Sequence, residues 1–251
     1  MEFAELKDSF IRNEVFCAQD RYLATYEKGR GKTVVFLHGG ASWWWSFRYQ
    51  YRYLGDKFKI IAPNLRGHGD SPWKDTDRLE DFYVDLQEWF KNEDFQEPVT
   101  IVGHSLGGYL AVRYTVDNPQ KVSKLILIST SGSIKKGVSR FILETCWPVA
   151  DIARRLFPRA VGLSSEMAGK LAKVIFPQWN CWELYSSLKV PTLVMLGLFD
   201  PLINFTCGFK IHSLIPNSQL QFFFSGHNPQ VSCGVEVAKS IENFVLDTVI
   251  E

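Results

Sequence analysis

The stretch Gly-His-Ser-Leu-Gly at residues 103–107 constrains the fold of this 251-residue chain more than any other feature. The apolar run at residues 98–102 predicts a short buried strand, and residues 106–116 predict a close-packed helix. A serine between them must sit on a sharp, strained turn that holds its hydroxyl clear of the sheet. The flanking glycines leave room for that turn. The pattern predicts a strand, a serine-bearing turn and a helix, an arrangement typical of a nucleophile.

A nucleophilic serine requires a base that accepts its proton and an acid that orients the base. The chain supplies both downstream, each after an apolar run that predicts a strand. Residues 191–196 lead to Asp200, and residues 219–224 lead to His227. We therefore expect Ser105, Asp200 and His227 to form a catalytic triad. Each residue also has a structural alternative, since an Asp before a Pro starts turns and a His can fill a core.

A loop upstream supplies groups that could stabilise charge. Residues 33–37 predict another buried strand, which runs directly into His38-Gly39-Gly40. In acyl transfer, backbone N–H groups bind the oxyanion that forms at the substrate carbonyl, and losing one donor costs about 3 kcal/mol. We expect the N–H groups of Gly40 and Leu106 to form this oxyanion hole.

In this order the motifs resemble those of the α/β-hydrolase superfamily, in its serine esterase and proline-iminopeptidase-like branch, over about residues 14–249. Residues 60–71 are similar to the family's Asp-x-Arg-Gly-x-Gly-x-Ser loop, with Asn64 in place of the Asp. Haloalkane dehalogenases and epoxide hydrolases of this fold carry Asp where this chain has Ser105, so the serine argues against both. The resemblance implies an α/β-hydrolase fold: a mostly parallel central sheet, helices on both faces and a helical cap insertion.

Strand-like and helical patterns alternate along the chain, as a parallel sheet covered by helices requires. Residues 79–89 and 231–245 have the apolar spacing of amphipathic helices. Residues 133–187 show no strand pattern and are rich in aromatic residues and prolines. We expect residues 1–132 and 188–251 to form the core domain and residues 133–187 to form the cap. Strands are expected at residues 14–18, 21–27, 33–37, 58–62, 99–102, 125–129, 193–196 and 220–224.

Aromatic side chains supply the candidates for a substrate pocket. Three consecutive tryptophans follow the oxyanion loop, and on one helix they cannot all face the same way, because neighbours are about 100° apart. Further aromatic residues crowd the expected cap. The alternative is that these side chains pack the first helix and the cap onto the core. The candidate pocket residues are Trp43, Trp44, Phe141, Trp147, Trp179 and Trp182.

Composition and charge narrow the class of partner. The 28 basic and 27 acidic residues leave a net charge of +1, which gives no reason to expect nucleic acid. No signal peptide is evident, and no apolar run reaches the ~18 residues of a membrane span. Five widely spaced cysteines are typical of free thiols in the cytoplasm. We expect His38, His68 and His104 to hold loops, with no metal, no cofactor and a small-molecule substrate. Nothing in the sequence predicts an oligomeric state.

The triad and the resemblance together predict a serine hydrolase that cleaves a small to medium apolar carboxylic ester through an acyl-enzyme. Several alternatives stay open. A proline-iminopeptidase-like aminopeptidase would use the same triad, although residues 38–42 match only half of its usual His-Gly-Gly-Pro-Gly. A carbon–carbon bond hydrolase or lyase, or a cofactor-free haloperoxidase, could reuse the same residues. A small-molecule receptor that retains the triad would turn over slowly or only once.

Overall fold

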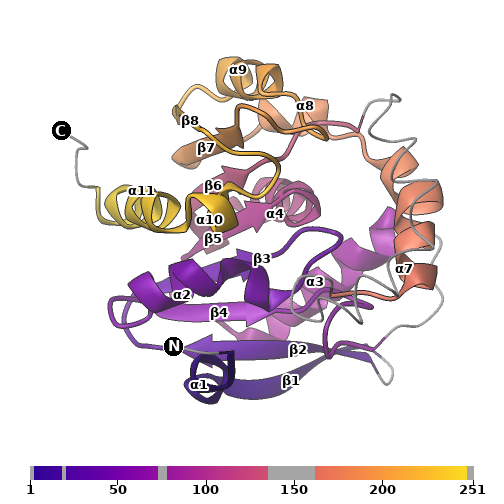
Figure 1. Ribbon diagram of the computed structural model, residues 1–251, viewed down its shortest axis with the longest axis vertical. Helices are drawn as coiled ribbons and strands as arrows, with labels where there is room; N and C mark the ends of the chain where they lie inside the picture. The colour runs from indigo at the N-terminus through magenta and orange to yellow at the C-terminus, as the bar shows by residue number, and fades with distance from the viewer. Residues whose placement is uncertain (1–2, 19–20, 73–77, 135–161, 248–251) are drawn as a thin grey trace.

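A sheet of eight strands forms the centre of the structure, a computed structural model that describes residues 3–18, 21–72, 78–134 and 162–247. The strands are β1 (Ile11–Ala18), β2 (Arg21–Lys28), β3 (Thr33–Leu37), β4 (Lys59–Pro63), β5 (Val99–His104), β6 (Val122–Ile128), β7 (Thr192–Gly197) and β8 (Ser218–Phe223). Their order across the sheet is β1-β2-β4-β3-β5-β6-β7-β8 (Figure 1). β1 pairs with β2 and β2 with β4 in antiparallel fashion, and the remaining pairs are parallel. The predicted mostly parallel sheet is confirmed.

The carboxyl ends of the parallel strands meet at one edge of the sheet, which is where ligand sites of open α/β sheets form. Ser105 follows β5 directly, and Gly40 lies three residues after β3. Asp200 lies three residues after β7, and His227 lies four residues after β8. The fold therefore brings all four candidate segments to the same edge.

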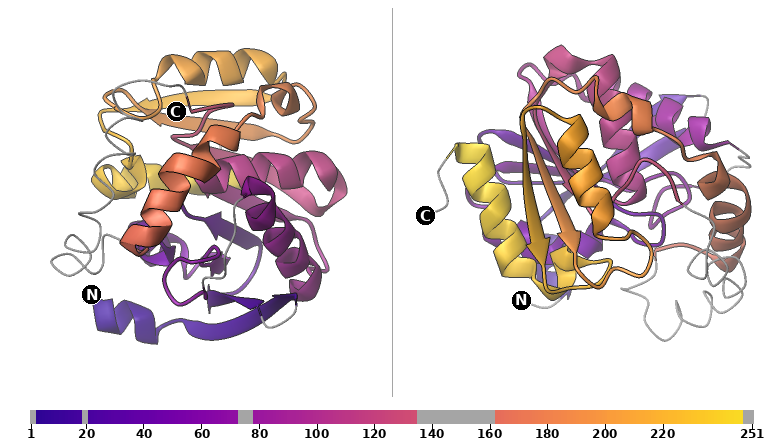
Figure 2. Two further views of the ribbon diagram at one scale, coloured as in Figure 1. Left: turned by 90° about the vertical axis from the view of Figure 1, so that its right-hand side faces the viewer. Right: turned by 90° about the horizontal axis from the view of Figure 1, so that it is seen from above.

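Helices cover both faces of the sheet (Figure 2). One face carries α1 (Phe3–Asp8), α2 (Arg48–Leu54) and α11 (Gly234–Leu246), which share a core cluster with the sheet. The other face carries α3 (Leu79–Glu93), α4 (Leu106–Asp117) and α9 (Thr206–Leu214). The short helix α10 (Pro229–Ser232) lies between β8 and α11. This is the layered arrangement that alternating strands and helices require.

The two predicted amphipathic helices are present, one of them with different bounds. α3 buries Leu79, Phe82, Leu86 and Trp89, as their spacing predicts. α11 begins at Gly234 rather than at residue 231, because α10 is a separate turn started by a proline. The buried stripe of α11 therefore runs through Val237, Ala238, Ile241 and Val245, and Val235 lies outside it.

The described part of the chain between β6 and β7 is helical. α7 (Ser165–Lys170) continues into a π-helical turn, Leu171–Ile175, and α8 (Trp182–Tyr185) follows. The N–H of Cys181 donates to the carbonyl of Gly132 at 2.8 Å, which fastens this segment to the chain after β6. Residues 135–161 lie outside the described residues, so the division into core and cap stays a prediction.

Candidate active site

Ser105 occupies the turn between β5 and α4 in a backbone conformation that few residues adopt. Its φ is +50° and its ψ is −114°, a strained region that costs about 1–3 kcal/mol for a residue with a side chain. The turn depends on two glycines. A Cβ on Gly103 would lie 2.6 Å from the carbonyl oxygen of Gly107, and a Cβ on Gly107 would lie 2.2 Å from that of Leu37. The local geometry is thus the strand, strained turn and helix that the sequence predicts.

Asp200 and His227 form a hydrogen-bonded pair. Nδ1 of His227 lies 2.7 Å from Oδ2 of Asp200. The other oxygen, Oδ1, accepts the N–H groups of Leu202 and Ile203 at 2.8 and 2.9 Å. Because Nδ1 faces a carboxylate, it carries the proton and leaves Nε2 with a lone pair. This is the tautomer that can accept a proton from a hydroxyl.

Ser105 lies at the same end of the sheet as this pair, but its hydroxyl is not hydrogen-bonded to it. Among the described residues no hydrogen bond joins Ser105 Oγ to His227. The ring of His104, the residue before the serine, lies 4.9 Å from the ring of His227. Nε2 of His104 donates to the His227 carbonyl at 2.9 Å. The residue that precedes the serine therefore holds the loop that carries the imidazole.

Burial keeps His104 neutral. Removal of the ring from water, with His227 nearby, lowers its pKa to about 3. The proton is on Nε2, which donates, and the buried Nδ1 has no hydrogen-bond partner among the residues that the structure describes. A Cβ on Gly39 would lie 2.6 Å from this Nδ1 and 3.3 Å from the Cβ of Ser105. The predicted oxyanion loop therefore packs directly against the serine turn.

Hydrogen bonds to the carbonyl of Gly39 aim the N–H of Gly40. This carbonyl accepts Nδ1–H of His38 at 2.8 Å and the N–H of Ser42 at 3.2 Å. Nε2 of His38 accepts the N–H of Leu65 at 2.9 Å, so Nδ1 is the protonated nitrogen. In a trans peptide the carbonyl and the following N–H point in opposite directions. The hydrogen bonds that hold the Gly39 carbonyl therefore also fix the direction of the Gly40 N–H.

A second histidine supports the next peptide of this loop. The ring nitrogens of His68 lie 2.8 Å from the carbonyl oxygens of Arg66 and Gly40. Burial lowers the pKa of His68, and it lowers the pKa of His38 well below its ordinary value. A neutral ring donates one of the two His68 contacts. As expected, both histidines hold loops by hydrogen bonds.

Leu106, the second predicted oxyanion donor, is the first residue of α4. N–H groups in the first turn of a helix have no partner within the helix, and the helix dipole places partial positive charge at that end. Leu106 itself is completely buried. Its N–H belongs to this first turn and directly follows Ser105 in the chain.

A hollow of about 430 Å³ borders the candidate site, and Trp43 lines it. Trp43 has an extended backbone, with φ −156°, and precedes the 3₁₀ helix Trp44–Phe47, so the three tryptophans do not share one helix. Asn228, which directly follows His227, lines the same hollow. The remaining lining residues are Ser42, Trp45, Ser46, Arg48 and Val231.

Trp44 lies in the core instead of the predicted pocket. Its side chain is buried and stacks on Tyr26 at 4.3 Å and on Tyr51 at 5.8 Å between ring centroids. Asn64 also contacts it, because Oδ1 of Asn64 accepts the N–H of Trp44 at 2.9 Å. This is the packing alternative that the sequence left open. The family's Asp position, occupied here by Asn64, thus has a structural role away from the site.

Two side chains that the pocket prediction missed cover the oxyanion loop. A Cβ on Gly40 would lie 2.9 Å from Cζ of Phe176 and 3.4 Å from Cδ1 of Leu171. Their only sequence signal is that they belong to the apolar segment of residues 133–187. No local pattern connects them with a glycine more than a hundred residues earlier.

The other pocket candidates have different places. Nε1 of Trp179 donates to the carbonyl of Ser131 at 2.9 Å, and Nε1 of Trp182 donates to Oγ of Ser133 at 3.0 Å. Both tryptophans therefore attach the segment before β7 to the chain after β6. Phe141 and Trp147 lie outside the described residues.

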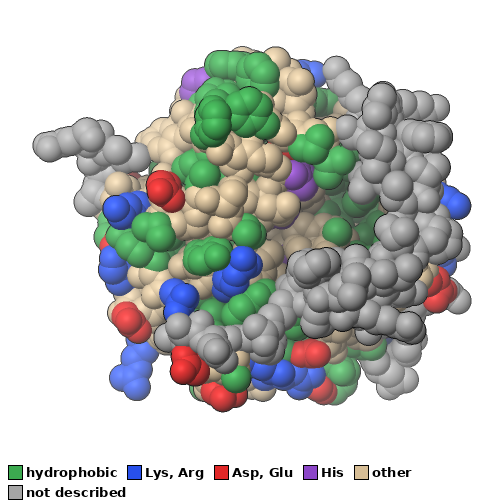
Figure 3. Space-filling model, in the orientation of Figure 1, with side chains coloured by type: hydrophobic (Ala, Val, Ile, Leu, Met, Phe, Trp, Pro, Cys, Tyr) green, Lys and Arg blue, Asp and Glu red, His purple; other side chains and the backbone are tan. Residues whose placement is uncertain are grey.

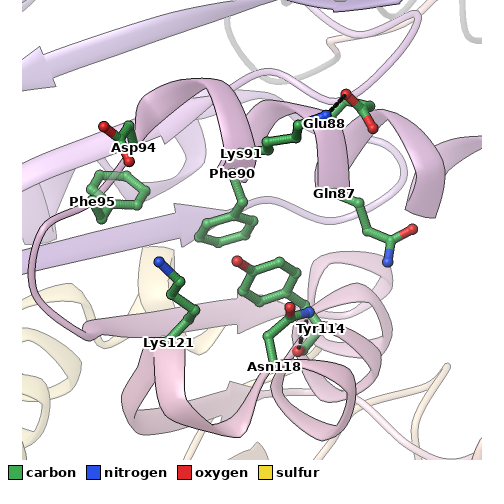
Figure 4. A pocket seen from close by; sticks show the side chains of 9 residues that line it. All are labelled: Gln87, Glu88, Phe90, Lys91, Asp94, Phe95, Tyr114, Asn118 and Lys121. Carbon is green, nitrogen blue, oxygen red and sulfur yellow. Dashed lines mark hydrogen bonds and ion pairs between the residues drawn. The ribbon is translucent and has the colours of Figure 1, made fainter.

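A separate hollow of about 440 Å³ lies at the far end of α3 and α4 (Figure 4). The rings of Phe90 and Tyr114 stack in it with centroids 3.8 Å apart. Its lining also includes Lys91, Asn118 and Lys121, and none of the candidate catalytic residues. Ser105 directly precedes α4, and Asn118 follows its last residue. This hollow therefore lies at the end of α4 that is remote from the candidate site.

Three further features concern membranes, metal ions and cysteines. In the described residues no helix is long and apolar enough to cross a membrane. No group of three metal-ligating side chains occurs in the same part of the chain. Cys17, Cys181, Cys207 and Cys233 are free thiols, and burial raises the pKa of Cys17 and of Cys181 to about 12.

Comparisons with known proteins agree with this fold. The family model described as the alpha/beta hydrolase fold matches residues 32–146. An uncharacterized protein of Mycobacterium tuberculosis is 26% identical over 80% of this chain and 71% of its own length. A soluble epoxide hydrolase of a Corynebacterium species is 33% identical over 51% of this chain and 44% of its own length. The esterase EaEST of Exiguobacterium antarcticum superposes with a TM-score of 0.83 at 21% identity, over 94% of this chain and all of that one.

The central sheet, its helical layers and the family match define an α/β-hydrolase fold. The family model and the solved structures with this fold support the α/β-hydrolase superfamily for this chain.

Proposed function

We propose that this protein is a serine hydrolase that cleaves a carboxylic ester of a small to medium, apolar substrate through an acyl-enzyme. The hydrogen bond of 2.7 Å between His227 and Asp200, at the sheet edge that also carries the strained Ser105, is the observation that supports it most. The buried Asp200 carboxylate fixes the imidazole in the tautomer that a general base requires.

In the first half of the reaction, Nε2 of His227 takes the proton of Ser105 as Oγ forms a bond to the carbonyl carbon of the ester. The carbonyl π electrons move to oxygen, and the N–H groups of Gly40 and Leu106 stabilise the resulting oxyanion. The intermediate then collapses, the bond to the alcohol oxygen breaks, and His227 returns the proton to the leaving alcohol. Rotation of the serine hydroxyl toward His227 is the first movement required, and such rotations take picoseconds to nanoseconds.

In the second half, water replaces the alcohol. Nε2 of His227 takes one proton from the water as its oxygen attacks the acyl carbon. The bond to Ser105 Oγ breaks, Oγ receives the proton, and the acid leaves. The enzyme returns to its starting state with one ester hydrolysed.

The lining favours an apolar acyl or alcohol group. Leu171 and Phe176 cover Gly40, and Trp43 lines the hollow that borders the His227 loop. The esterase with the same fold supports ester cleavage, whereas the partly matching epoxide hydrolase raises a second chemistry. Attack of a serine on an epoxide would leave an ether with no carbonyl for water to attack. Ser105 therefore supports ester cleavage.

A substrate screen tests this proposal. p-Nitrophenyl esters of increasing acyl length are compared with aminoacyl amides, lactones and a carbon–carbon cleavage substrate. The wild type should turn over the shorter esters repeatedly, and Ser105→Ala should lose that activity. Ser123→Ala, a serine on β6 outside the site, serves as the matched control. Full activity of Ser105→Ala would refute the nucleophile. Preference for aminoacyl amides, or a single turnover with a stable adduct, would favour the peptidase or the receptor.

A further inference from the structure

The sheet edge at β8 carries a large exposed apolar surface. Figure 3 shows hydrophobic side chains gathered at the top of the molecule, over α9. Five large apolar side chains, at the start of α9, on it and just after β7 and β8, are between 37% and 81% exposed, and they make up half of the large exposed apolar residues in the described part of the chain. We call them the edge patch: Leu198, Phe199, Phe205, Phe209 and Phe224.

Ring contacts hold the phenylalanines of the edge patch in two clusters. The rings of Phe199 and Phe224 lie 4.6 Å apart. Phe205 and Phe209 both contact Phe222, at 6.2 and 5.1 Å. The chain turns at Phe224, where the N–H of Ser225 donates to the carbonyl of Phe223 at 2.8 Å. The edge patch therefore consists of two ring clusters, one between α9 and β8 and one just beyond the ends of β7 and β8.

The two edge strands of the sheet differ in their protection against pairing. β1 carries Arg12 and Glu14, which form an ion pair at 3.0 Å, and its ladder is interrupted by an irregularity after Phe16. Charges and bulges of this kind prevent an edge strand from pairing with another chain. β8 has the sequence Ser-Gln-Leu-Gln-Phe-Phe, with no charge and no proline. The β8 edge is open to pairing.

Half of the backbone groups of β8 point away from β7. The carbonyl of Phe223 accepts the N–H of Leu198 at 2.9 Å, so the backbone of Phe223 faces the β7 side. Because backbone groups alternate along a strand, those of Leu220 and Phe222 point outward. In the part of the chain that the structure describes, no strand pairs with this outer side.

We propose that a second copy of this chain covers the edge patch, with β8 pairing antiparallel to the partner's β8 across a two-fold axis. Identical edges related by a two-fold axis are self-complementary, and the pairing satisfies the outward N–H and C=O groups. A lipid surface would bury the same groups without hydrogen-bond partners, which is unfavourable. The second copy is therefore the better occupant.

The available area agrees with a dimer. With about 200 Å² for a whole aromatic side chain, the exposed fractions of the edge patch amount to roughly 500 Å². A standard interface covers about 800 Å² on each partner, of which roughly 60% is apolar. The edge patch alone thus supplies the apolar part of such an interface.

Sedimentation velocity from 1 to 100 µM on the full chain tests the proposal. The wild type should sediment as a dimer, and the double variant Phe209→Lys with Phe224→Lys should weaken association at least 100-fold. Ile11→Lys, at an exposed apolar position on the opposite edge strand, is the matched control and should remain dimeric. Hydrogen exchange should show the amides of Leu220 and Phe222 protected at high concentration and unprotected on dilution.

Three results would overturn the dimer. One is a wild type that stays monomeric at 100 µM. Another is a dimer that forms through a different surface, as shown by an intact dimer of the double lysine variant or by amides of Leu220 and Phe222 that are never protected. The third is a monomer that sediments with phosphatidylcholine vesicles and loses this binding in the double variant, which would make the edge patch a lipid-binding surface. None of these outcomes depends on the proposed esterase activity.

Discussion

The candidate site has two halves that the fold builds in different ways. The buried half consists of the Gly39-Gly40 loop and the Ser105 turn, held by histidines that burial keeps neutral. The edge half consists of Asp200 and His227, on loops that begin beside the exposed rings of the edge patch. In the buried half, packing and hydrogen bonding set the geometry. In the edge half, a few hydrogen bonds set it. Substitutions in the buried half should therefore change both the free energy of unfolding and the catalytic rate, and substitutions in the edge half should change mainly the catalytic rate.

The largest effect is expected from Asp200→Asn in the edge half. The amide cannot hold Nδ1–H of His227 as the carboxylate does, so kcat for ester hydrolysis should fall about 10⁴-fold. The urea unfolding midpoint should stay close to that of the wild type. Asp56→Asn, at an exposed aspartate, is the control. A fall below tenfold would place the acid at another carboxylate, and a large loss of stability would remove the contrast between the halves.

A large loss of stability is expected from Asp85→Ala, which acts on the buried half. Arg66 and Asp85 form a buried ion pair at 2.7 Å, and Arg66 lies on the loop that carries His68. Removal of one partner leaves a buried charge unpaired and should lower the free energy of unfolding by about 3–5 kcal/mol. Urea denaturation measures this loss. Glu88→Ala removes a surface ion pair with Lys91 on the same helix and should change it by less than about 1 kcal/mol. Equal effects of the two variants would contradict the prediction.

The oxyanion loop offers a test that joins rate and stability. His38→Leu removes a hydrogen bond that fixes the Gly39 carbonyl, so the direction of the Gly40 N–H should become less well defined. We expect kcat to fall about 10²-fold with a smaller change in KM. The rates are measured below the unfolding transition of the variant, with the exposed His212→Leu as control. An unchanged kcat in the folded variant would show that the loop keeps its geometry without His38.

The smallest effect concerns pH and His104. Its pKa of about 3 in the fold lies below the ordinary 6.5, so the unfolded chain binds a proton that the folded chain refuses. Stability from this group is complete above pH 6.5 and is lost as the pH falls toward 3. At pH 5 the loss should be about 2 kcal/mol. The difference in unfolding free energy between wild type and His104→Gln should shrink by this amount between pH 8 and pH 5. The other titratable groups are the same in both proteins, so their contributions cancel in the difference. A constant difference would mean that His104 has the same pKa in the folded chain as in the unfolded chain.

The fold was predictable because its signals are local. Most buried strands appear in the sequence as short apolar runs, and the strained turn at Ser105 appears as a serine between glycines. The start of β6 was missed because Ser123 and Lys124 interrupt its apolar pattern, although both lie on the strand. The bounds of α11 were missed because an apolar spacing continues through Val231 into a separate turn.

The site was predictable only in part. Motifs after strands β3, β5, β7 and β8 indicate which residues meet, because parallel strands share one edge. The contacts of Gly40 with Leu171 and Phe176, and the stacking of Trp44 on Tyr26, depend on tertiary packing that no local spacing encodes. The sequence therefore does not indicate which aromatic residues near a site line the substrate pocket and which pack into the core.

The contact between α4 and β3 has a practical consequence for changing the substrate range. A side chain at Gly107 would collide with the main chain of Leu37, which cannot move without displacing the sheet. Mutagenesis libraries should therefore leave positions 103 and 107 invariant. Diversity is better placed at Trp43, Leu171 and Phe176, whose side chains can be exchanged while the serine turn keeps its shape.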